Sequence, residues 1–223
     1  MPRAALTKPG EVPASTKARI LSAAEAVFAA RGFDGASTRE IAAKAGVNIA
    51  GIAYHFGGKD RLYLACAEHI ARTVAAGVTQ RLAIDRQSEP KAANAELKRT
   101  LSGIAEFMLA TPEAADFARF ILREQTDPSP AFDILYGALM EPLHKRLCLL
   151  WAEATGTEAE TERTKLKVFA LISQVFFFRL ARAGALRRLS WTDIGADEIS
   201  AIITLATESV DALIDHEQRR VSP

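Results

Sequence analysis

Apolar residues recur at spacings of three and four along most of the chain, and glycines or prolines separate the segments that carry this pattern. The first segment runs from Thr16 to Arg31 and is ended by Gly32; its apolar side holds Ile20, Ala24, Val27 and Phe28. No segment alternates between apolar and polar residues, and the sequence contains no hairpin turn signal. The pattern therefore predicts an all-α chain.

Two very short helices are expected next. Thr38 can cap a helix that ends at Gly46, and Asn48 can cap another that covers Ile49 to Phe56. Helices of about two turns are marginal alone and bury little, so packing does not explain them well. Their spacing is typical of a helix-turn-helix, which places its second helix in the major groove of DNA. Short helices joined by a glycine turn also occur in ordinary bundles, so that alternative stays open here.

Longer helices are expected in the rest of the chain. The predicted segments are about Lys59 to Ala83, Thr111-Pro112-Glu113 to Asp127, Ala131 to Ala154 with a kink at Pro142, Glu158 to Ala183, and Asp193 to His216, with a loop around Pro90. We expect a flexible arm over residues 1–15, a three-helix domain with the helix-turn-helix over residues 16–62, and a larger helical bundle domain over residues 84–223. The fourth helix continues from the first domain to about residue 83.

Composition describes a globular chain of one to two domains, since 49% of the 223 residues are hydrophobic and 25% are charged. The net charge of +1 argues against a nucleic-acid partner when it is averaged over the chain. Residues 1–62, however, hold nine basic and five acidic side chains, which makes this segment +4 and the remainder −3. A cationic N-terminal segment on a weakly acidic body favours contact with phosphate.

Several other classes of protein are disfavoured. Cys66 and Cys148 stand far apart with no Cys-x-x-Cys or Cys/His cluster, so we expect reduced thiols, no metal site and no cofactor. The N-terminal residues lack the apolar core of a signal peptide, and no apolar run reaches the roughly 18 residues that span a bilayer, so a cytoplasmic protein without a membrane partner is expected. Gly58-Lys59 lacks the other residues of a P-loop, and no nucleophile elbow or zinc-protease motif is present, which argues against an enzyme.

The short helices carry a recognisable motif. Thr38-Arg39-Glu40-Ile41-Ala42-x-x-Ala45-Gly46-Val47, followed by Tyr54-His55-Phe56-x-x-Lys59-x-x-Leu62, closely resembles the DNA-binding domain of TetR-type transcriptional repressors. The resemblance covers about residues 16–70. It implies that the backbone of DNA is held by Thr38, Tyr54, His55 and Lys59, and that the bases are faced by Asn48, Ile49, Ala50 and Gly51.

Elementary chemistry agrees with these assignments. Thr38 and Arg39 begin a helix, where free N–H groups attract phosphate, and Lys59 begins another. Tyr54 and His55 have polar tips that can donate to phosphate oxygens, although His55 can instead form a capping or inter-helix hydrogen bond. The sequence departs from the family at Ala53, where many members place a tyrosine that touches phosphate. That contact is therefore absent or moved to Tyr54.

A second resemblance concerns the C-terminal part. Phe120-Ile121-Leu122-Arg123-Glu124-Gln125, with the following Pro128-Ser129-Pro130-Ala131-Phe132, looks like the CecR-type branch of the family, and this likeness covers about residues 90–214. It implies a domain that binds an effector and dimerises. The candidates for lining an apolar ligand cavity are Phe107, Phe117, Phe120, Arg123, Phe132, Met140, His144, Trp151 and Phe177. Taken singly, each aromatic side chain is more typical of the core than of a pocket wall.

The two C-terminal helices have apolar seams over several turns, so pairs from two subunits can form a four-helix bundle. The predicted dimer residues are Phe169, Ser173, Phe176, Leu180, Ile199, Ile202, Ala206, Val210 and Leu213. The alternative is that these seams pack only within one subunit. We expect a homodimeric, ligand-responsive repressor that is released from a palindromic double-stranded DNA operator by a small apolar or aromatic effector. The alternatives are an activator, or a helical protein-interaction module without sequence-specific DNA binding.

Overall fold

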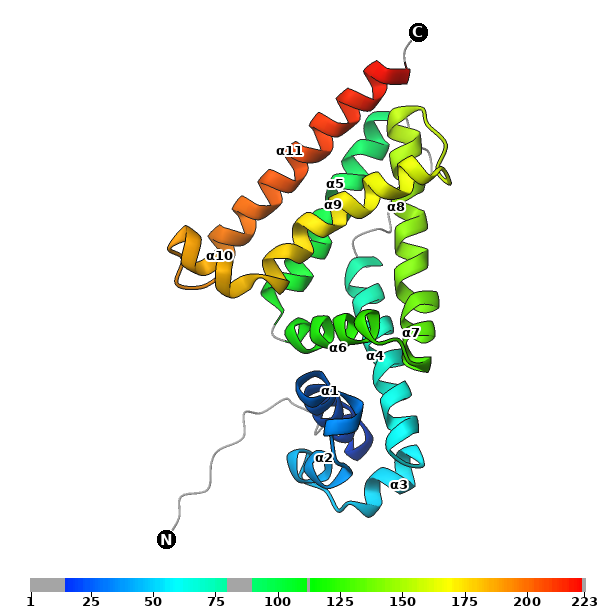
Figure 1. Cartoon of the computed structure of the whole chain (residues 1–223), viewed down its shortest axis with the longest axis vertical. Coiled ribbons are helices and arrows are strands. Elements are labelled where there is room, and N and C mark those ends of the chain that lie inside the picture. The colour runs from blue at the N-terminus through cyan, green and yellow to red at the C-terminus, as the bar shows by residue number, and fades with distance from the viewer. Residues whose placement is uncertain (1–14, 80–89, 112, 222–223) are drawn as a thin grey trace. The chain divides into compact units, whose positions relative to one another are not determined.

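The computed structural model describes residues 15–79, 90–111 and 113–221, and every regular element in these ranges is a helix. The predicted all-α class is thereby confirmed. The chain divides into two compact units, Met1–Ala65 and Cys66–Pro223 (Figure 1). Each unit is described by itself below.

The first unit holds α1 (Thr16–Gly35), α2 (Thr38–Ala45), α3 (Ala50–Phe56) and the beginning of α4 (Lys59–Thr79). Phe28 of α1, Ile41 of α2 and Leu62 of α4 are fully buried, so one core joins three helices. The ring of Tyr63 meets Phe28 edge to face, with 4.8 Å between centroids. These contacts stabilise helices that are too short to persist alone.

The ends of these helices differ in detail from the predictions. The chain leaves helical geometry at Gly32, where φ is 72°, but it resumes for one more turn up to Gly35. Ser37, rather than Thr38, caps α2, because its hydroxyl accepts from the N–H of Glu40 at 3.1 Å. Either side chain suits an N-cap; the extended backbone of Ser37 decides between them.

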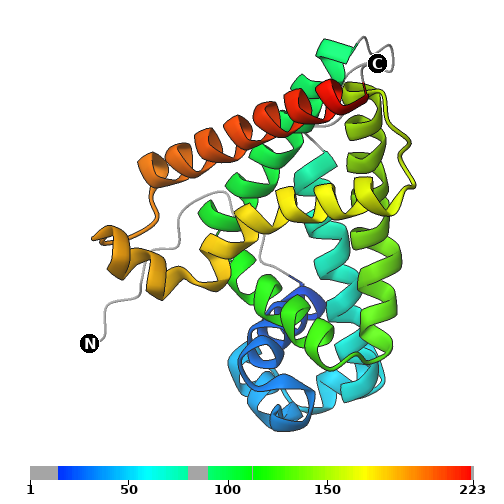
Figure 2. The ribbon, with the colours of Figure 1, turned by 45° about the horizontal axis from the view of Figure 1, so that its top comes forward.

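The second unit contains the remaining helices, which are α5 (Pro90–Ala110), α6 (Ala114–Thr126), α7 (Pro130–Leu135), the π-helix η1 (Tyr136–Met140), α8 (Glu141–Thr155), α9 (Glu162–Leu180), α10 (Arg182–Leu189) and α11 (Ala196–Val221). α5 packs against α8, α9 and α11 and is the central element of the unit. Figure 2 shows α11 and α9 crossing over it. Leu97, Leu101, Met108 and Trp151 are almost completely buried around α5.

Two predicted helices are divided in the structure. The kink expected at Pro142 takes the form of the five-residue π-helix just before it, because proline has no N–H to donate and its ring displaces a carbonyl of the preceding turn. The segment predicted as Glu158–Ala183 begins at Glu162 with a Thr161 cap and stops at Leu180, and a separate α10 follows. α6 begins at Ala114; Pro112 and residues 80–83 of the predicted fourth helix lie outside the described residues.

Two buried carboxylates hold the second unit together. Glu96 of α5 pairs with Arg146 of α8, and Glu217 of α11 accepts from Arg163 of α9 at 2.8 and 3.0 Å. Arg220 also donates to Glu217 at 2.6 Å. The Arg163 hydrogen bonds, opposed by desolvation and supported by Arg220, lower the pKa of Glu217 from 4.5 to about 2. Both acids are satisfied structural groups.

Candidate nucleic-acid interface and ligand cavity

The turn between α2 and α3 is held in place by a side chain from α1. Gly46 adopts a left-handed conformation, with φ at 64°, and ends α2. The guanidinium of Arg19 donates to the carbonyl of Ala45 at 3.1 and 2.6 Å and to that of Gly46 at 2.7 Å. Arg19 thus satisfies carbonyl groups that the helix end leaves without partners and sets the direction in which the chain enters α3.

α3 is anchored by two residues and presents the rest. Ile52 and Phe56 are buried, whereas Ala50 and Ala53 are exposed and Tyr54 is 85% exposed. Ile49, just before α3, is 48% exposed and adds an apolar side chain to the same region of the chain. A seven-residue helix with so little of its surface buried is suited to enter a groove of another molecule.

Asn48 acts at the start of α3 as predicted, because its Oδ1 accepts from the N–H of Ala50 at 2.9 Å. This bond leaves the amide NH₂ of Asn48 as the side-chain group for a base. Gly51 lies against Ile20 and Val47, where an added Cβ would be 3.8 and 4.0 Å from their side chains. A side chain at this position would therefore point toward α1 and Val47 of the same unit.

Polar groups flank α3. Arg39 is exposed, Thr38 is half-buried, and His55 meets Tyr54 edge to face with 5.0 Å between ring centroids. The ammonium of Lys59 lies 4.4 Å from the centroid of Phe33, in cation–π geometry. All nine predicted DNA-contact residues thus belong to the first unit. Arg19 was missed, since nothing in the sequence links it to a turn 26 positions later.

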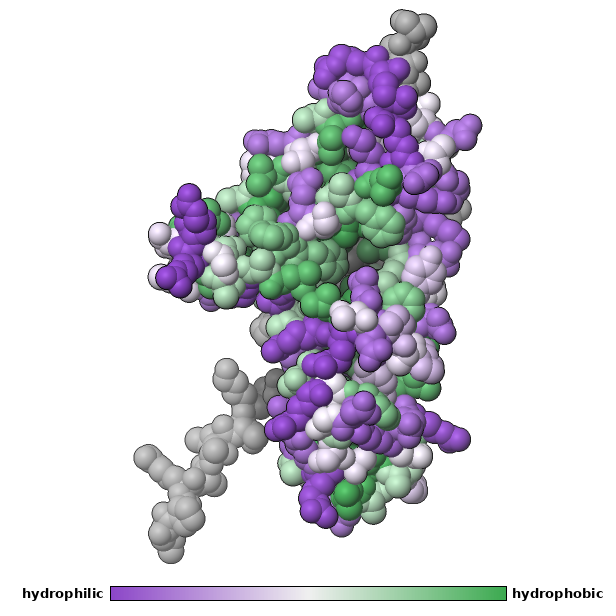
Figure 3. All heavy atoms as spheres, viewed as in Figure 1, coloured by the Kyte–Doolittle hydropathy of each residue, from purple (hydrophilic) through white to green (hydrophobic). Residues whose placement is uncertain are grey.

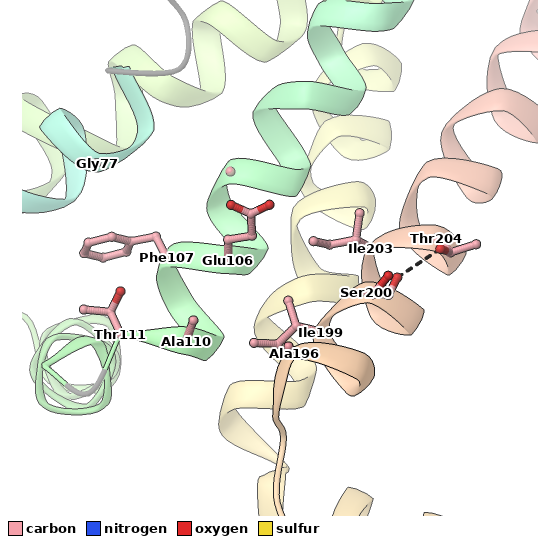
Figure 4. A pocket seen from close by; sticks show the side chains of 11 residues that line it. Gly77, Glu106, Phe107, Ala110, Thr111, Ala196, Ile199, Ser200, Ile203 and Thr204 are labelled. Atoms are coloured by element: carbon pink, nitrogen blue, oxygen red, sulfur yellow. Dashed lines mark hydrogen bonds between the residues drawn. The ribbon is translucent and has the colours of Figure 1, made fainter.

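A cavity of about 720 Å³ lies within the second unit (Figure 4). Its size is in the range of small-molecule sites. It is lined by Gly77, Gly103, Glu106, Phe107, Ala110, Thr111, Ala196, Ile199, Ser200, Ile203 and Thr204. The wall therefore combines apolar side chains of α5 and α11 with one carboxylate and several hydroxyl groups.

Of the predicted cavity residues, Phe107 lines this cavity. Phe117, Phe120 and Trp151 are at most 4% exposed and are not among the residues that line this cavity, so their role as ligand contacts stays a prediction. The other five also stay outside the cavity wall: Arg123 and Phe177 are exposed, and Phe132, Met140 and His144 are half-buried. The sequence alone does not separate these environments.

His144 contacts α9 instead of the cavity. Its ring lies 4.0 Å from that of Phe169, and its Nε2 is 3.3 Å from the carbonyl of Lys165. On the other side, its Nδ1 lies 3.6 Å from the sulfur of Cys148. Burial raises the pKa of Cys148 to about 11, so this thiol stays protonated at neutral pH.

Several apolar side chains of α9 are exposed. The α9 face is made of Leu166, Phe169, Ser173, Phe177 and Leu180, which recur at spacings of three and four and are all exposed. Leu205 of α11 is also 56% exposed. Figure 3 shows apolar residues gathered over α9 and the neighbouring part of α11. An exposed apolar area of this kind is typical of an interface.

The predicted dimer seam on α11 needs correction. Ile199, Ile202, Ala206 and Val210 are at most 8% exposed, because they face the core of their own unit; Ile199 and Ile202 pack with Leu109 and Ile194. Of the predicted α11 residues, only Leu213 is half-buried. On α9, by contrast, Phe169, Ser173 and Leu180 are exposed and Phe176 is half-buried. The periodicity on α11 reports internal packing.

Two negative findings concern the residues that the structure describes. No single helix there is long and apolar enough to span a membrane, although α9 and α10, which meet with a bend of 80°, pass such a test when taken as a pair. Within the same ranges, no group of three or more His, Cys, Asp or Glu side chains is placed to hold a metal ion.

Comparison with known families gives two matches. Residues 20–66 match the family described as bacterial regulatory proteins, tetR family, and residues 93–216 match the C-terminal domain of the HTH-type transcriptional dual regulator CecR. The dual regulator CecR of Shigella flexneri is 33% identical over 222 residues, which cover 97% of each chain. A probable HTH-type regulator of Bacillus subtilis, YttP, is 33% identical over 50% of this chain and 51% of its own.

Solved structures share the fold. A TetR-like regulator from Rhodococcus sp. RHA1 aligns with a TM-score of 0.64 at 20% identity, covering 90% of this chain and 99% of the other. AibR, solved in complex with isovaleryl coenzyme A and operator DNA, aligns with a TM-score of 0.63 at 16% identity, over 90% of this chain and 96% of its own.

Proposed function

Because the chain belongs to the TetR family of bacterial regulators, in the branch with a CecR-type C-terminal domain, we propose that it is a homodimeric repressor. Proteins of this family are DNA-binding transcription regulators and not enzymes. In our proposal, a palindromic operator binds the two α3 helices, and a small effector with an apolar or aromatic body releases it. The protein would then act in the cytoplasm, where the operator DNA is found.

The DNA-binding part of the proposal rests on one observation: α3 is exposed, and the turn before it is held in place. Arg19 holds the turn through three hydrogen bonds, and α3 leaves Ile49, Ala50 and Tyr54 exposed. A rigid presentation lowers the ordering cost of binding. Thr38, Arg39 and Lys59 add donors for phosphate at the beginnings of α2 and α4.

The chemistry of α3 suggests how bases are read. Ile49 and Ala50 can contact thymine methyl groups, and Asn48 retains its amide NH₂ for an acceptor in the major groove. Few other hydrogen-bonding groups are present on this helix. We therefore propose that part of the specificity comes from the shape and deformability of the DNA.

The homodimer uses the α9 face in our proposal. Leu166, Phe169 and Phe177 are each at least 57% exposed, and their removal from water favours association. A second copy supplies an identical surface, so a two-fold axis can cover both faces at once. Two DNA-binding units would then address half-sites about 34 to 36 Å apart.

The effector binds in the cavity of the second unit in this proposal. Gly77, a residue of α4, lines the cavity, and the same helix begins at Lys59 in the DNA-binding unit. A ligand that binds more tightly to one of two conformations that differ in the placement of α4 shifts the population of molecules toward that conformation. The affinity for the operator then changes by the same difference in binding free energy.

One relative favours a second mode of action. The Shigella flexneri protein is named a dual regulator, so the same chain can be proposed to activate at some promoters and to repress at others. Both modes need the same contacts with DNA. The position of the operator relative to the promoter then decides the sign of regulation.

Selection of bound sequences from a random duplex library, repeated at several salt concentrations, tests the proposal. An inverted repeat whose half-sites are about one DNA turn apart is expected. Tyr54→Ala and Lys59→Ala should weaken binding to that repeat, whereas Arg188→Ala, an exposed change on α10, should not. Wild-type affinity in both Tyr54→Ala and Lys59→Ala would overturn the assignment of the interface. Recovery of no sequence, with weak salt dependence, would favour the protein-interaction alternative.

A further inference from the structure

Lys17, in the first turn of α1, carries a positive charge that no carboxylate pairs with among the residues that the structure describes. The residue is exposed, and its ammonium lies 5.7 Å from the centroid of the Phe56 ring, in cation–π geometry. Phe56 is the last residue of α3 and is itself buried. The ring therefore holds the ammonium at the end of α3 and leaves its charge in place.

Two other cations of α1 are already engaged. Arg31 donates to the carboxylate of Glu40 at 2.8 Å and is thereby paired. Arg19 donates to two carbonyl groups of the turn before α3. Lys17 differs from both, because an aromatic ring restricts a side chain without cancelling its charge. Its ammonium thus keeps donors for an anion that arrives from outside.

The beginning of α1 lies along α3. Arg19 contacts the turn that leads into α3, and Ile20 lies beside the first turn of that helix, where a Cβ added at Gly51 would be 3.8 Å from its Cδ1. Lys17 reaches the other end of the same helix, at Phe56. The first turn of α1 therefore follows α3 from one end to the other, within one compact unit.

A helix that enters the major groove of DNA fills most of it. Its diameter with side chains is about 10 to 12 Å and the groove is about 12 Å wide, so the two sugar–phosphate strands lie against the flanks of the helix. An exposed ammonium held beside α3 is then within reach of a phosphate. Such contacts fix the register of a protein on DNA and do not read bases.

We propose that Lys17 binds a phosphate of the DNA backbone beside α3. The inference rests on the proposed DNA-binding function and adds to it a contact that comes from α1. Lys59, at the beginning of α4, is placed in the same way, with its ammonium 4.4 Å from the ring centroid of Phe33. Two ammonium groups held by aromatic rings, one from α1 and one from α4, thus bind the backbone of the DNA that α3 enters. The rings restrict both side chains in advance, which lowers the ordering cost of binding.

The test uses the full chain and a fluorescein-labelled duplex that carries the inverted repeat recovered by selection. Anisotropy titrations over a series of salt concentrations give the slope of log K against log salt. Lys17→Gln should reduce this slope by about 0.9 for each bound subunit, and Lys17→Met, which keeps an apolar contact with Phe56, should do the same. Lys17→Arg should retain the wild-type slope. Arg188→Gln removes the same charge from an exposed position on α10 and should also retain it.

Ethylation of single phosphates in the duplex locates the contact. One phosphate in each half-site should interfere with binding when it is ethylated in the wild type and should no longer interfere in Lys17→Gln, and it should differ from the phosphate that is lost in Lys59→Gln. An unchanged slope in Lys17→Gln would overturn the inference, whether the affinity is retained or is lowered by a structural effect on α3. An unchanged ethylation pattern would overturn it as well. Failure of the wild type to bind duplex DNA with a steep salt dependence would instead refute the proposed function, and the inference with it, so the two failures are distinguishable.

Discussion

Gly77 and Phe107 form a contact whose energy can be predicted with its sign. A Cβ added at Gly77 would lie 2.8 Å from Cδ2 and 3.1 Å from Cε2 of Phe107. Carbon atoms in contact prefer about 3.5 to 4.0 Å, so Gly77→Ala forces the ring to move by about 0.7 Å or more. Overpacking of this kind costs about 1 to 3 kcal/mol.

A second effect opposes the clash. Alanine is more favourable than glycine within a helix by up to about 1 kcal/mol, and by less near a helix end; α4 ends at Thr79. We therefore expect Gly77→Ala to lower the free energy of unfolding by about 0 to 2 kcal/mol in the wild type. In a Phe107→Ala background the ring is absent, so the same change should be neutral or stabilising by up to about 1 kcal/mol.

The assay is urea denaturation of the four proteins at one fixed protein concentration, because a dimer makes stability depend on concentration. The expected coupling between the two positions is about 1 to 3 kcal/mol. Gly184→Ala on α10, where an added Cβ meets nothing within 4 Å, is the control and should have the same effect in both backgrounds. A coupling below about 0.5 kcal/mol would refute the argument that Phe107 needs a glycine beside it.

Three further results are expected. Arg19→Met should weaken operator binding by about 10-fold, because the turn before α3 becomes looser, and should leave the salt dependence of binding unchanged. Arg39→Gln should instead reduce the slope of log K against log salt by about 0.9, because one phosphate contact is lost. Anisotropy titrations over a series of salt concentrations distinguish the two effects. Phe169→Glu should convert a dimer into a monomer in sedimentation velocity, and Leu122→Glu on α6 should not. Because the folded-state pKa of Glu217 is about 2 instead of 4.5, ionised Glu217 contributes on the order of 3 kcal/mol to the free energy of unfolding; this contribution is present above pH 4.5 and is lost as pH falls through about 2. Glu217→Gln should flatten this part of the pH–stability curve, and an unchanged slope would contradict the role of Arg163.

The helix-turn-helix was predictable because its signals are local. A glycine that must adopt positive φ ends α2 at Gly46, and Asn48 caps the next helix within two residues of its own position. Such features depend on neighbours in the sequence, so α2 and α3 were predicted to within one residue at each end. The identity of the α2 cap was missed because Ser37 and Thr38 offer the same chemistry.

The second unit was harder to predict because its features depend on distant neighbours. Apolar residues that face another helix of the same chain have the same three-and-four spacing as apolar residues that face a partner subunit. The sequence pattern therefore does not distinguish Val210, which is in the core, from Phe169, which is on the surface. α10 is absent from the prediction, which ends one helix at Ala183 and begins the next at Asp193; the structure has a separate helix over Arg182–Leu189.

The π-helix between α7 and α8 determines how the chain tolerates changes of length. Buried or half-buried apolar residues recur every four positions from Leu135 through Leu139, Leu143 and Leu147 to Trp151. In a continuous α-helix this spacing drifts by about 40° per step, and Trp151 would rotate away from the face that holds Leu135. A π turn uses one extra residue per turn and removes part of that drift. Deletion of one residue from η1 can therefore restore an ordinary α turn, whereas the same deletion inside α8 would turn everything after it by about 100°. This segment is thus expected to tolerate the loss of one residue better than the regular helix that follows it.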